Sequence, residues 1–443
     1  MQKAILLIWC VLLGIVSSAQ TLELSLREAK QMAIDSSYAT RNARYNTAKK
    51  REEVREVLSI GLPQVNAKAE LQDFLDIPVS LIPSEFTGGQ PGEFDEVQFG
   101  TQFNLTAQVS ASQLLFDGTY FIGLKASRVV VELSRDKERK SEQEIKLSVA
   151  EAYHSVLLAE ENTRILQENL KNIEETLEET RKLFESGFTE EQDVDQLLLN
   201  KNQIQVNLDN TRRIYEISTR SLNFIIGLPI QTELKLTDNI ESLVALSNDS
   251  EYLERDPNLE THPDLMLAKT NREIQELTVK GEKAAYYPSL SAFFNHQQVA
   301  QRNEFNFTET NQPWFPTTIV GATLNIPIWS SFERQAKVRQ AQIGLEQSEM
   351  QLRQTRETIA LDMERARSNY QNAMKVYQNQ KSSVELAKRI LDKTTIKYKE
   401  GVVTSLELNV AQSQLLQEQS NSIQAAFELL TAKQELDRAL NIF

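Results

Sequence analysis

Residues 145–187 read IKLSVAEAYHSVLLAEENTRILQENLKNIEETLEETRKLFESG, and this stretch decides the fold. Apolar or small side chains recur in it at alternating steps of four and three residues, the heptad spacing of a coiled coil. A helix over 120–185 would be about 100 Å long at 1.5 Å per residue. The stretch therefore predicts a long helix that packs through one seam. The seam positions are Ile145, Val149, Ala152, Val156, Ala159, Thr163, Leu166, Leu170, Ile173, Leu177, Thr180 and Phe184.

A second stretch, 332–399, keeps this spacing with smaller and more polar seam residues and predicts a helix of about the same length. Shorter helices are predicted on either side of the two long ones. Laid end to end, two of these short helices approximately match one long helix, so the pattern predicts a rod of coiled-coil pairs. The shorter helices are expected at 26–60, 189–226, 263–285 and 404–441.

The two long helices end in related motifs, which indicates an internal repeat. Leu183-Phe184-Glu185-Ser186-Gly187 recurs 214 residues later as Lys397-Tyr398-Lys399-Glu400-Gly401. Each half is predicted to run helix, strand, strand, long helix, helix. We place the first repeat at 20–227, a linker at 228–261 and the second repeat at 262–443.

Two strands are predicted in each repeat, because apolar and polar side chains alternate there. A single strand of this kind is typical of a soluble hairpin with one face exposed to solvent. Four such strands attached to long helices instead favour a transmembrane β-barrel. Four strands cannot close a barrel, and open edges are not tolerated in lipid, so several chains must share one barrel. The strands are expected at about 64–76, 98–115, 288–299 and 317–329, with exposed loops at 77–97 and 299–316.

Residues 1–19 have the pattern of a secretory signal peptide. Lys3 precedes an apolar run, and small residues lead to a cleavage site between Ala19 and Gln20. Lys3 is the only charged residue in this segment, so cleavage changes the formal net charge from −14 to −15. The only cysteine, Cys10, lies in the apolar run, so the mature chain carries no thiol. The pattern predicts an exported protein without disulfides.

Composition excludes several classes of function. The acidic balance disfavours binding to nucleic acid, and no later segment approaches eighteen consecutive apolar residues, so helical membrane spans are not expected. His154, His262 and His296 are isolated and lack metal-ligand spacing. No glycine-rich phosphate-binding loop is present. We therefore predict no enzyme, no metal and no cofactor.

The order of these elements, with the internal repeat, resembles the TolC family of outer-membrane efflux proteins over essentially the whole mature chain. Leu24-Ser25-Leu26-Arg27-Glu28-Ala29 resembles the opening motif of the family, with Ser25 and Glu28 spaced as a capping box. Thr261-His262-Pro263 resembles the opening of the second half, where Pro263 suits a first helical turn. The segment 398–409 resembles the hairpin of the family's gate.

The resemblance implies a mainly α fold with a β-barrel part. The duplicated helix–strand–strand–helix–helix chain would form a homotrimer, with a twelve-strand transmembrane β-barrel on a long periplasmic α-helical coiled-coil barrel. The protein would lie in the outer membrane with a large periplasmic portion, the linker near the equator of the tunnel. It would be the passive exit duct of a tripartite efflux or type I secretion system. A periplasmic adaptor and an inner-membrane RND or ABC pump would open its periplasmic end.

The two hairpin tips are the candidate gate. Gly187 and Gly401 suit the left-handed turn that ends a long helix. By resemblance, Tyr398 is the gate tyrosine, Asp193 its hydrogen-bond partner, and Glu407 part of a carboxylate ring; Glu407 also fits a capping box with Thr404, and the two roles can coexist. The sequence departs from the family at two positions, Val403 and Val410, which stand where a latch arginine and a second ring aspartate are found.

Two other classes of protein share some of these features. A periplasmic adaptor, which links a pump to a separate channel, has a single helical hairpin set into small β-rich domains and no duplicated plan. A filamentous coiled-coil scaffold does not need alternating strands. The repeat and the strand pattern argue against both. Nothing in the sequence identifies the cargo.

Overall fold

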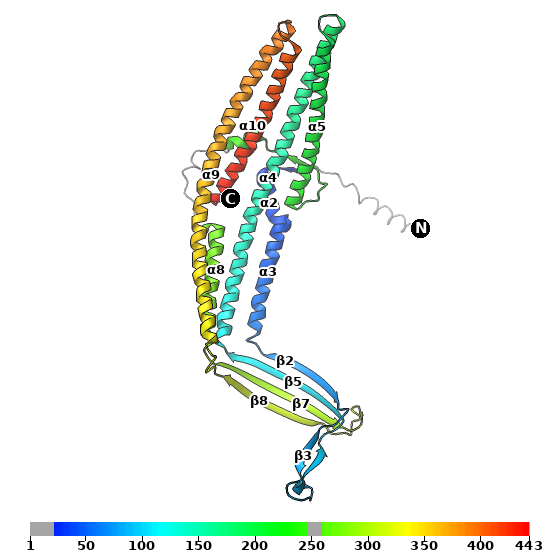
Figure 1. The fold of residues 1–443 in the computed structure, drawn as a ribbon, viewed down its shortest axis with the longest axis vertical. Coiled ribbons are helices and arrows are strands. Elements are labelled where there is room, and N and C mark those ends of the chain that lie inside the picture. The colour runs from blue at the N-terminus through cyan, green and yellow to red at the C-terminus, as the bar shows by residue number, and fades with distance from the viewer. Residues whose placement is uncertain (1–21, 247–258, 443) are drawn as a thin grey trace, which may run out of the picture. The chain divides into compact units, whose positions relative to one another are not determined.

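The computed structural model describes residues 22–246 and 259–442, which divide into two compact units (Figure 1). A helical unit comprises the chain up to Thr47 with Ser134–Lys269 and Gln351–Phe443, and a sheet unit comprises Ala48–Leu133 and Thr270–Met350. The predicted cleavage site at Ala19 and Gln20 lies outside the described residues, as does part of the predicted linker.

Two helical hairpins form most of the helical unit. The long helix α4 (Gly118–Glu185) leads into α5 (Glu191–Ile226), and the long helix α9 (Glu333–Lys399) leads into α10 (Ser405–Ala439). The first residues of α4 and α9 belong to the sheet unit. The heptad patterns thus located both long helices to within two residues at each end. Over 22–246 and 259–442, no helix combines the length and apolar character that a membrane span needs.

The prediction of a single helix over 26–60 is wrong, because the structure has two helices there, α2 (Leu26–Ser36) and α3 (Tyr38–Ser59). Ser37 between them is extended, with φ −62° and ψ 148°, and its hydroxyl accepts a hydrogen bond of 3.2 Å from the Thr40 N–H. Serine side chains compete in this way with helical hydrogen bonds. Gly227 lies against the break: a Cβ there would be 2.4 Å from the Ser36 carbonyl oxygen, so only glycine fits.

Two predicted helix starts are confirmed. Ser25 and Glu28 form a capping box at the start of α2: the Ser25 N–H donates to the Glu28 carboxylate at 2.9 Å, and the Glu28 N–H donates to the Ser25 hydroxyl at 3.3 Å. Pro263 is the first residue of α8 (Pro263–Ala284), where its missing N–H removes no helical hydrogen bond.

A single apolar cluster, which we call the central core, joins the two hairpins away from their tips. It takes side chains from α2, α4, α5, α9 and α10, and from the segment after α5. Burial of so many apolar groups is the main stabilising term in such a unit. Its members include Leu24, Ala29, Val149, Tyr153, Val156, Leu222, Ile226, Leu236, Ala366, Tyr370, Ile423, Leu429 and Leu436.

The predicted linker contains regular structure. β6 (Leu234–Leu236) pairs in parallel with β1 (Leu22–Leu24), and α6 (Ile240–Leu246) follows. The Asp238 carboxylate accepts a 2.7 Å hydrogen bond from the Leu26 N–H and lies 2.9 Å from the hydroxyl of buried Tyr153. This segment is therefore tied to the start of the described chain and to α4.

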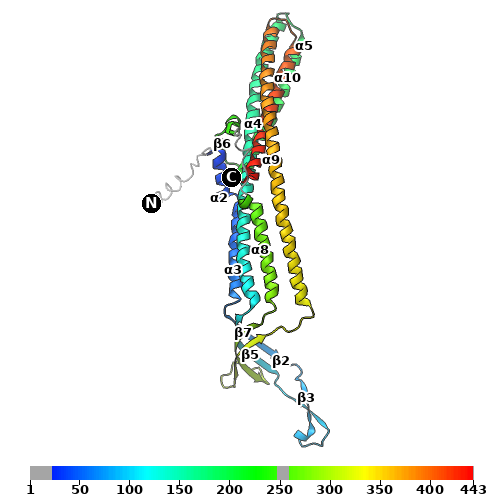
Figure 2. The ribbon, with the colours of Figure 1, turned by 90° about the vertical axis from the view of Figure 1, so that its left-hand side faces the viewer.

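The sheet unit contains a four-stranded antiparallel sheet in the order β2-β5-β7-β8 (Figures 1 and 2). The bounds are β2 (Gln64–Asp73), β5 (Phe103–Phe116), β7 (Ser289–Arg302) and β8 (Phe315–Asn325). The strands from the two halves of the chain pair directly through β5 and β7. β2 and β8 lie at the edges, and within residues 22–246 and 259–442 no further strand pairs with either of them.

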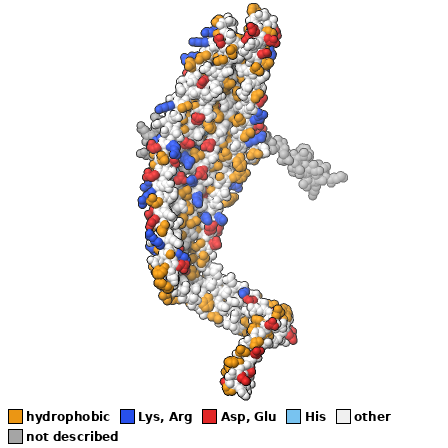
Figure 3. All heavy atoms as spheres, viewed as in Figure 1, with side chains coloured by type: hydrophobic (Ala, Val, Ile, Leu, Met, Phe, Trp, Pro, Cys, Tyr) orange, Lys and Arg blue, Asp and Glu red, His pale blue; other side chains and the backbone are white. Residues whose placement is uncertain are grey.

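Register places the alternating residues on separate faces of the sheet. Ala111, Phe294 and Val320 are cross-strand partners on one face, and Gln108, Gln297 and Thr317 are partners on the other. Figure 3 shows charged side chains of both signs over the helical hairpins, whereas the sheet carries few. β5 and β8 contain no charged residue. The sheet therefore has one largely apolar face and one polar, mostly uncharged face.

The region predicted as a loop at 77–97 instead holds a second hairpin, in which β3 (Val79–Pro83) pairs with β4 (Phe94–Gln98). The segment is rich in glycine and proline, a composition typical of loops, and this obscures its short strands. Gly88 and Gly92, with φ of +92° and +94°, provide the turns between the strands. The predicted strand over 317–329 ends early, at Asn325, because Pro327 cannot donate to a ladder.

Candidate functional site: the paired hairpin tips

The two hairpin tips, at residues 186–190 and 400–404, share one turn geometry. Gly187 and Gly401 have φ of +79° and +72°, the left-handed conformation predicted for them. After α4, the Gly187 and Phe188 N–H groups donate to the carbonyls of Phe184 and Leu183 at 2.9 and 2.8 Å. The corresponding pair after α9 has distances of 2.9 and 2.9 Å. Both are Schellman motifs, which satisfy the last carbonyls of a helix.

The next helix of each hairpin begins in a different way. Thr404 caps α10, because its hydroxyl accepts from the Glu407 N–H at 3.4 Å. At the other tip the N-cap of α5 is Glu190. There the Asp193 carboxylate folds back and accepts from the Glu190 N–H at 3.3 Å and from the Thr189 hydroxyl.

Asp193 also joins the two tips. Its second carboxylate oxygen accepts a hydrogen bond from the hydroxyl of Ser405, the first residue of α10. Ser405 is buried. Partial burial disfavours the ionised form of Asp193, but the hydrogen bonds from Ser405, Thr189 and the Glu190 N–H outweigh it and lower the pKa of the carboxyl. A charge-assisted bond of this kind is stronger than one between neutral groups.

Tyr398 forms the second link between the hairpins. Its hydroxyl lies 2.8 Å from the hydroxyl of Thr180 on α4. Thr180 is fully buried. The Thr180 hydroxyl donates to the Thr176 carbonyl at 2.9 Å, so in this pair Tyr398 is the donor. Nearby, Lys399 and Glu179 form an ion pair of 3.4 Å; both side chains are more than half exposed, so its contribution is small.

The predicted hydrogen bond from Tyr398 to Asp193 is absent from this structure. Both oxygens of Asp193 are taken by Ser405, Thr189 and the Glu190 N–H, and Thr180 lies within reach of Tyr398 instead. Asp193 and Tyr398 therefore both connect the hairpins, but through partners that the sequence analysis missed. Two signals existed: Thr180 is one of two hydroxyl residues, with Thr163, in a mostly apolar seam, and Ser405 directly follows the cap of α10.

Glu407 is exposed on α10. Its N–H takes part in the cap, whereas no hydrogen bond or ion pair of its carboxylate is found within the described ranges 22–246 and 259–442. The same exposed face carries Leu406 and Val410, which are 58% and 59% exposed. The tip of α10 therefore presents one carboxylate between two apolar side chains.

Between the tips and the central core, amide side chains line the contact between the hairpins. Asn200 on α5 donates to Asn409 on α10 at 3.3 Å, and Asn169 on α4 donates to Gln419 on α10 at 3.3 Å. A cavity of about 30 Å³ lies among these helices. The apolar cluster at this level belongs almost entirely to α4 and α5 and comprises Leu166, Ile173, Leu177, Leu197, Ile204 and Leu208. We call this contact the amide seam.

None of the three histidines contributes to the tips. His154 is buried beside Gln434 in the helical unit, and burial, with Lys30 nearby, lowers its pKa to about 4. Burial also lowers the pKa of His262. His296 pairs with Thr318 in the sheet at 2.8 Å. Among the described residues, no three His, Cys, Asp or Glu side chains are grouped as metal ligands would be.

Comparison with known proteins shows that the chain belongs to a family of outer-membrane proteins. Residues 30–228 and 256–441 match the family model for the outer membrane efflux protein. The alkaline protease secretion protein AprF of Pseudomonas aeruginosa is 23% identical over 326 residues, 73% of this chain and 67% of AprF. The outer membrane protein TolC of Vibrio cholerae is 20% identical over 346 residues, 76% of each chain. The crystal structure of CusC has the same fold, with a TM-score of 0.71, 16% identity and coverage of 95% of this chain and 92% of CusC.

Proposed function

Because the chain belongs to the outer membrane efflux protein family, we propose that it is the outer-membrane exit duct of a tripartite efflux or type I secretion system. It is a passive channel, and the energy for export comes from its partners. Since the family match covers both halves of the chain, the adaptor alternative is not favoured. A duct needs neither a catalytic group nor a cofactor.

The observation that carries the proposal is the four-stranded sheet with unpaired edges at β2 and β8. A sheet with one apolar and one polar face can separate lipid from water. Its open edges, however, would leave backbone hydrogen-bonding groups unpaired in lipid. Three copies, joined edge to edge, form a twelve-strand barrel without edges. We therefore propose a homotrimer that shares one barrel in the outer membrane.

Exposed apolar stripes on the helical unit support association of copies. Along α5, apolar side chains repeat at seven, eight, three and seven residues, which keeps them on one helix face. A second exposed stripe follows α9. A contact between stripes on two different helices is head-to-tail, and such a contact forms a ring when its rotation closes. The α5 stripe consists of Leu199, Val206, Ile214, Ile217 and Phe224, and the α9 stripe of Leu361, Val376, Leu386 and Ile390.

The hairpin tips form the periplasmic gate in this proposal. The hydrogen bonds from Ser405 to Asp193 and from Tyr398 to Thr180 hold the two hairpins of one chain together, and Gly187 and Gly401 form the turns. Threefold repetition of Glu407 places three carboxylates at a narrow mouth, where their summed field favours cations. A periplasmic adaptor and an inner-membrane RND or ABC pump open this gate by separating the hairpins.

The assembly is tested by mass measurement of the purified protein in detergent. Three copies of a chain that begins at Gln20, recovered from the outer-membrane fraction, are the expected result. A stable monomer in that fraction contradicts the edge argument, and an intact Met1 contradicts the predicted cleavage. Single-channel recordings of the same sample test whether it conducts ions.

The stripes are tested by placing a charge within one of them. Ile217 is 66% exposed, so Ile217→Asp should leave the fold of one chain intact while it disrupts the trimer. Glu216→Lys changes charge at the neighbouring position, off the stripe, and should leave the mass unchanged. If both variants stay trimeric, the α5 stripe is not a subunit contact.

A further inference from the structure

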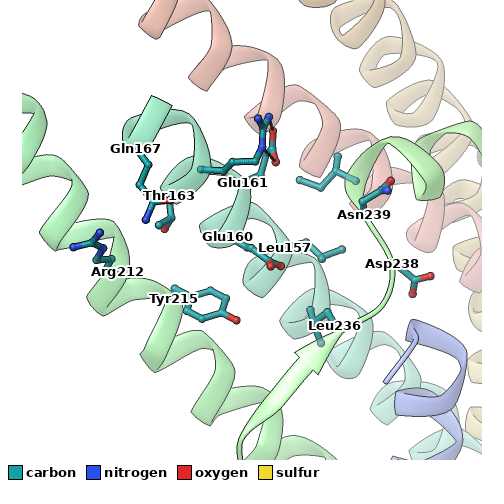
Figure 4. A pocket seen from close by; sticks show the side chains of 12 residues that line it. Leu157, Glu160, Glu161, Thr163, Gln167, Arg212, Tyr215, Leu236, Asp238 and Asn239 are labelled. Atoms are coloured by element: carbon teal, nitrogen blue, oxygen red, sulfur yellow. Dashed lines mark hydrogen bonds and ion pairs between the residues drawn. The ribbon is translucent and has the colours of Figure 1, made fainter. Parts of the chain in front are cut away.

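A cavity of about 490 Å³ opens in the helical unit where the segment after β6 crosses the hairpin of α4 and α5 (Figure 4). This volume is in the range of small-molecule sites. It lies apart from the tips and is unused in the proposed gate. Its lining includes Leu157, Glu160, Arg164, Arg212, Tyr215 and Leu236.

One carboxylate in the cavity, that of Glu160, has no partner among the residues that the structure describes. Figure 4 shows Glu160 of α4 and Tyr215 of α5 extending into the same space beside Leu157 and Leu236. Across the described ranges 22–246 and 259–442, no hydrogen bond or ion pair of the Glu160 carboxylate is found. Lys235, which is close enough to influence Glu160, forms an ion pair of 2.8 Å with Glu23.

The charges around Glu160 favour a cation. Partial burial, and then the neighbouring Glu161 carboxylate, raise the pKa of Glu160, while Lys235 acts in the opposite direction. Burial and Glu160 likewise raise the pKa of the Tyr215 hydroxyl. The cationic residues of the lining are already engaged: Arg164 pairs with Glu161 and Glu168, and Arg212 lies 3.7 Å from Asp209.

We propose that this cavity binds an organic monocation with a short apolar stem, such as a primary ammonium on an alkyl chain. The ammonium pairs with Glu160, the stem lies on Leu157 and Leu236, and the Tyr215 ring adds a cation–π contact. Two sources share this chemistry: a free alkylamine, and the lysine side chain of a partner polypeptide.

The test titrates the purified full-length protein in detergent with n-butylammonium, observed by ligand NMR. Saturable binding with a dissociation constant on the order of 1 mM is expected for so small a ligand. n-Butanol, which has the stem without the charge, should bind at least tenfold more weakly. Equal binding of the two ligands, or no saturation, overturns the proposal.

Variants then assign the site. Glu160→Gln keeps the shape of a half-exposed side chain, so it should fold normally and weaken n-butylammonium binding at least tenfold. Glu175→Gln removes an exposed charge elsewhere on α4 and should change the affinity less than twofold. Tyr215→Phe, which keeps the ring, should have an effect under threefold, whereas Tyr215→Leu should weaken binding more strongly. Unchanged affinity in Glu160→Gln would falsify the assignment.

A lysine-containing peptide distinguishes a free alkylamine from the lysine side chain of a partner protein. The capped tripeptide acetyl-Ala-Lys-Ala-amide presents the same ammonium on a polypeptide. Affinity at least tenfold higher than that of n-butylammonium identifies a protein partner as the occupant, whereas equal or weaker binding identifies a free cation. In either case Glu160→Gln must reduce the affinity. None of these outcomes depends on the channel function.

Discussion

The central core and the amide seam both join the two helical hairpins, but with opposite chemistry. In the central core, Leu222 of α5 and Leu429 of α10 are fully buried in one apolar cluster that includes α4 and α9. Toward the tips, the hairpins meet through polar contacts such as the hydrogen bond from Asn200 to Asn409, and the apolar cluster lies in α4 and α5 with only Leu416 of α10 packed against it. Separating the hairpins in the central core would expose many apolar groups to water at once, which costs much free energy. Separating them at the amide seam would replace hydrogen bonds between side chains by hydrogen bonds to water, at a small net cost. The difference suits hairpins that part at the tips while the core stays closed.

The largest expected effect is in the central core. Leu429→Ala should lower the free energy of unfolding by about 2–5 kcal/mol, because it leaves a cavity in a packed cluster. Ile396→Ala, at a position 59% exposed near the tip, is the matched control and should change stability by less than about 0.5 kcal/mol. Denaturant unfolding in detergent measures both. Similar values would show that the two regions do not differ.

The next effect comes from His154 in the same unit. Its pKa is about 4 in the folded protein against 6.5 as the ordinary value, so stability present above pH 6.5 is lost as the pH falls toward 4. The loss is about 3 kcal/mol, at about 1.4 kcal/mol per pKa unit. His154→Gln should flatten the profile between these pH values. An unchanged slope in that variant assigns the pH dependence to other groups.

At the tips, Ser405→Ala should weaken the contact between the hairpins by about 1.5–3 kcal/mol, the usual range for a hydrogen bond to a charged group. The fold should persist, since the central core is untouched. Higher basal conductance in single-channel recordings is the expected readout. Asp193→Asn combined with Ser405→Ala completes a double-mutant cycle, in which strictly additive effects would show that the two side chains do not interact.

Tyr398→Phe should have a smaller effect, because it removes one hydroxyl whose partner, Thr180, is neutral. About 1 kcal/mol is expected for the closed tips, with a modest rise in basal conductance. Thr180→Val, which removes the acceptor, should have a similar effect. If Tyr398→Phe exceeds Ser405→Ala in conductance, the ranking of the two links is reversed. If Val403 stands where relatives carry a latch arginine, as the resemblance implies, basal conductance should already exceed that of an arginine-latched relative.

The smallest change in stability is expected for Glu407→Gln. The cap depends on the Thr404 hydroxyl and the backbone N–H of residue 407, which the substitution leaves in place. Cation preference should fall in single-channel recordings if the three carboxylates line the mouth. Thr404→Ala is the complementary variant, with a cost of about 1 kcal/mol at the cap and unchanged selectivity. If the ion selectivity of Glu407→Gln is unaltered, the Glu407 carboxylates do not line the narrow mouth of the channel.

Local patterns in the sequence determined the long helices, the turns and two helix starts. Heptad spacing places α4 and α9, because a seam of this period is buried only by a helix. Gly187 and Gly401 fall where a left-handed residue must end a helix, and Ser25 and Glu28 cap α2 through contacts three residues apart. Such features involve neighbours along the chain, so a single sequence carries them in full.

Only the tertiary structure decided which groups meet across the chain. Tyr398 pairs with Thr180, 218 residues away, and Asp193 with Ser405, 212 residues away. Ser37 breaks a helix that local propensity would continue, where Gly227 at the end of α5 packs against it. Likewise the segment after β6 places Leu236 beside Glu160 of α4 and Tyr215 of α5. The register in which two hairpins pack selects these partners, and no short-range pattern encodes that register.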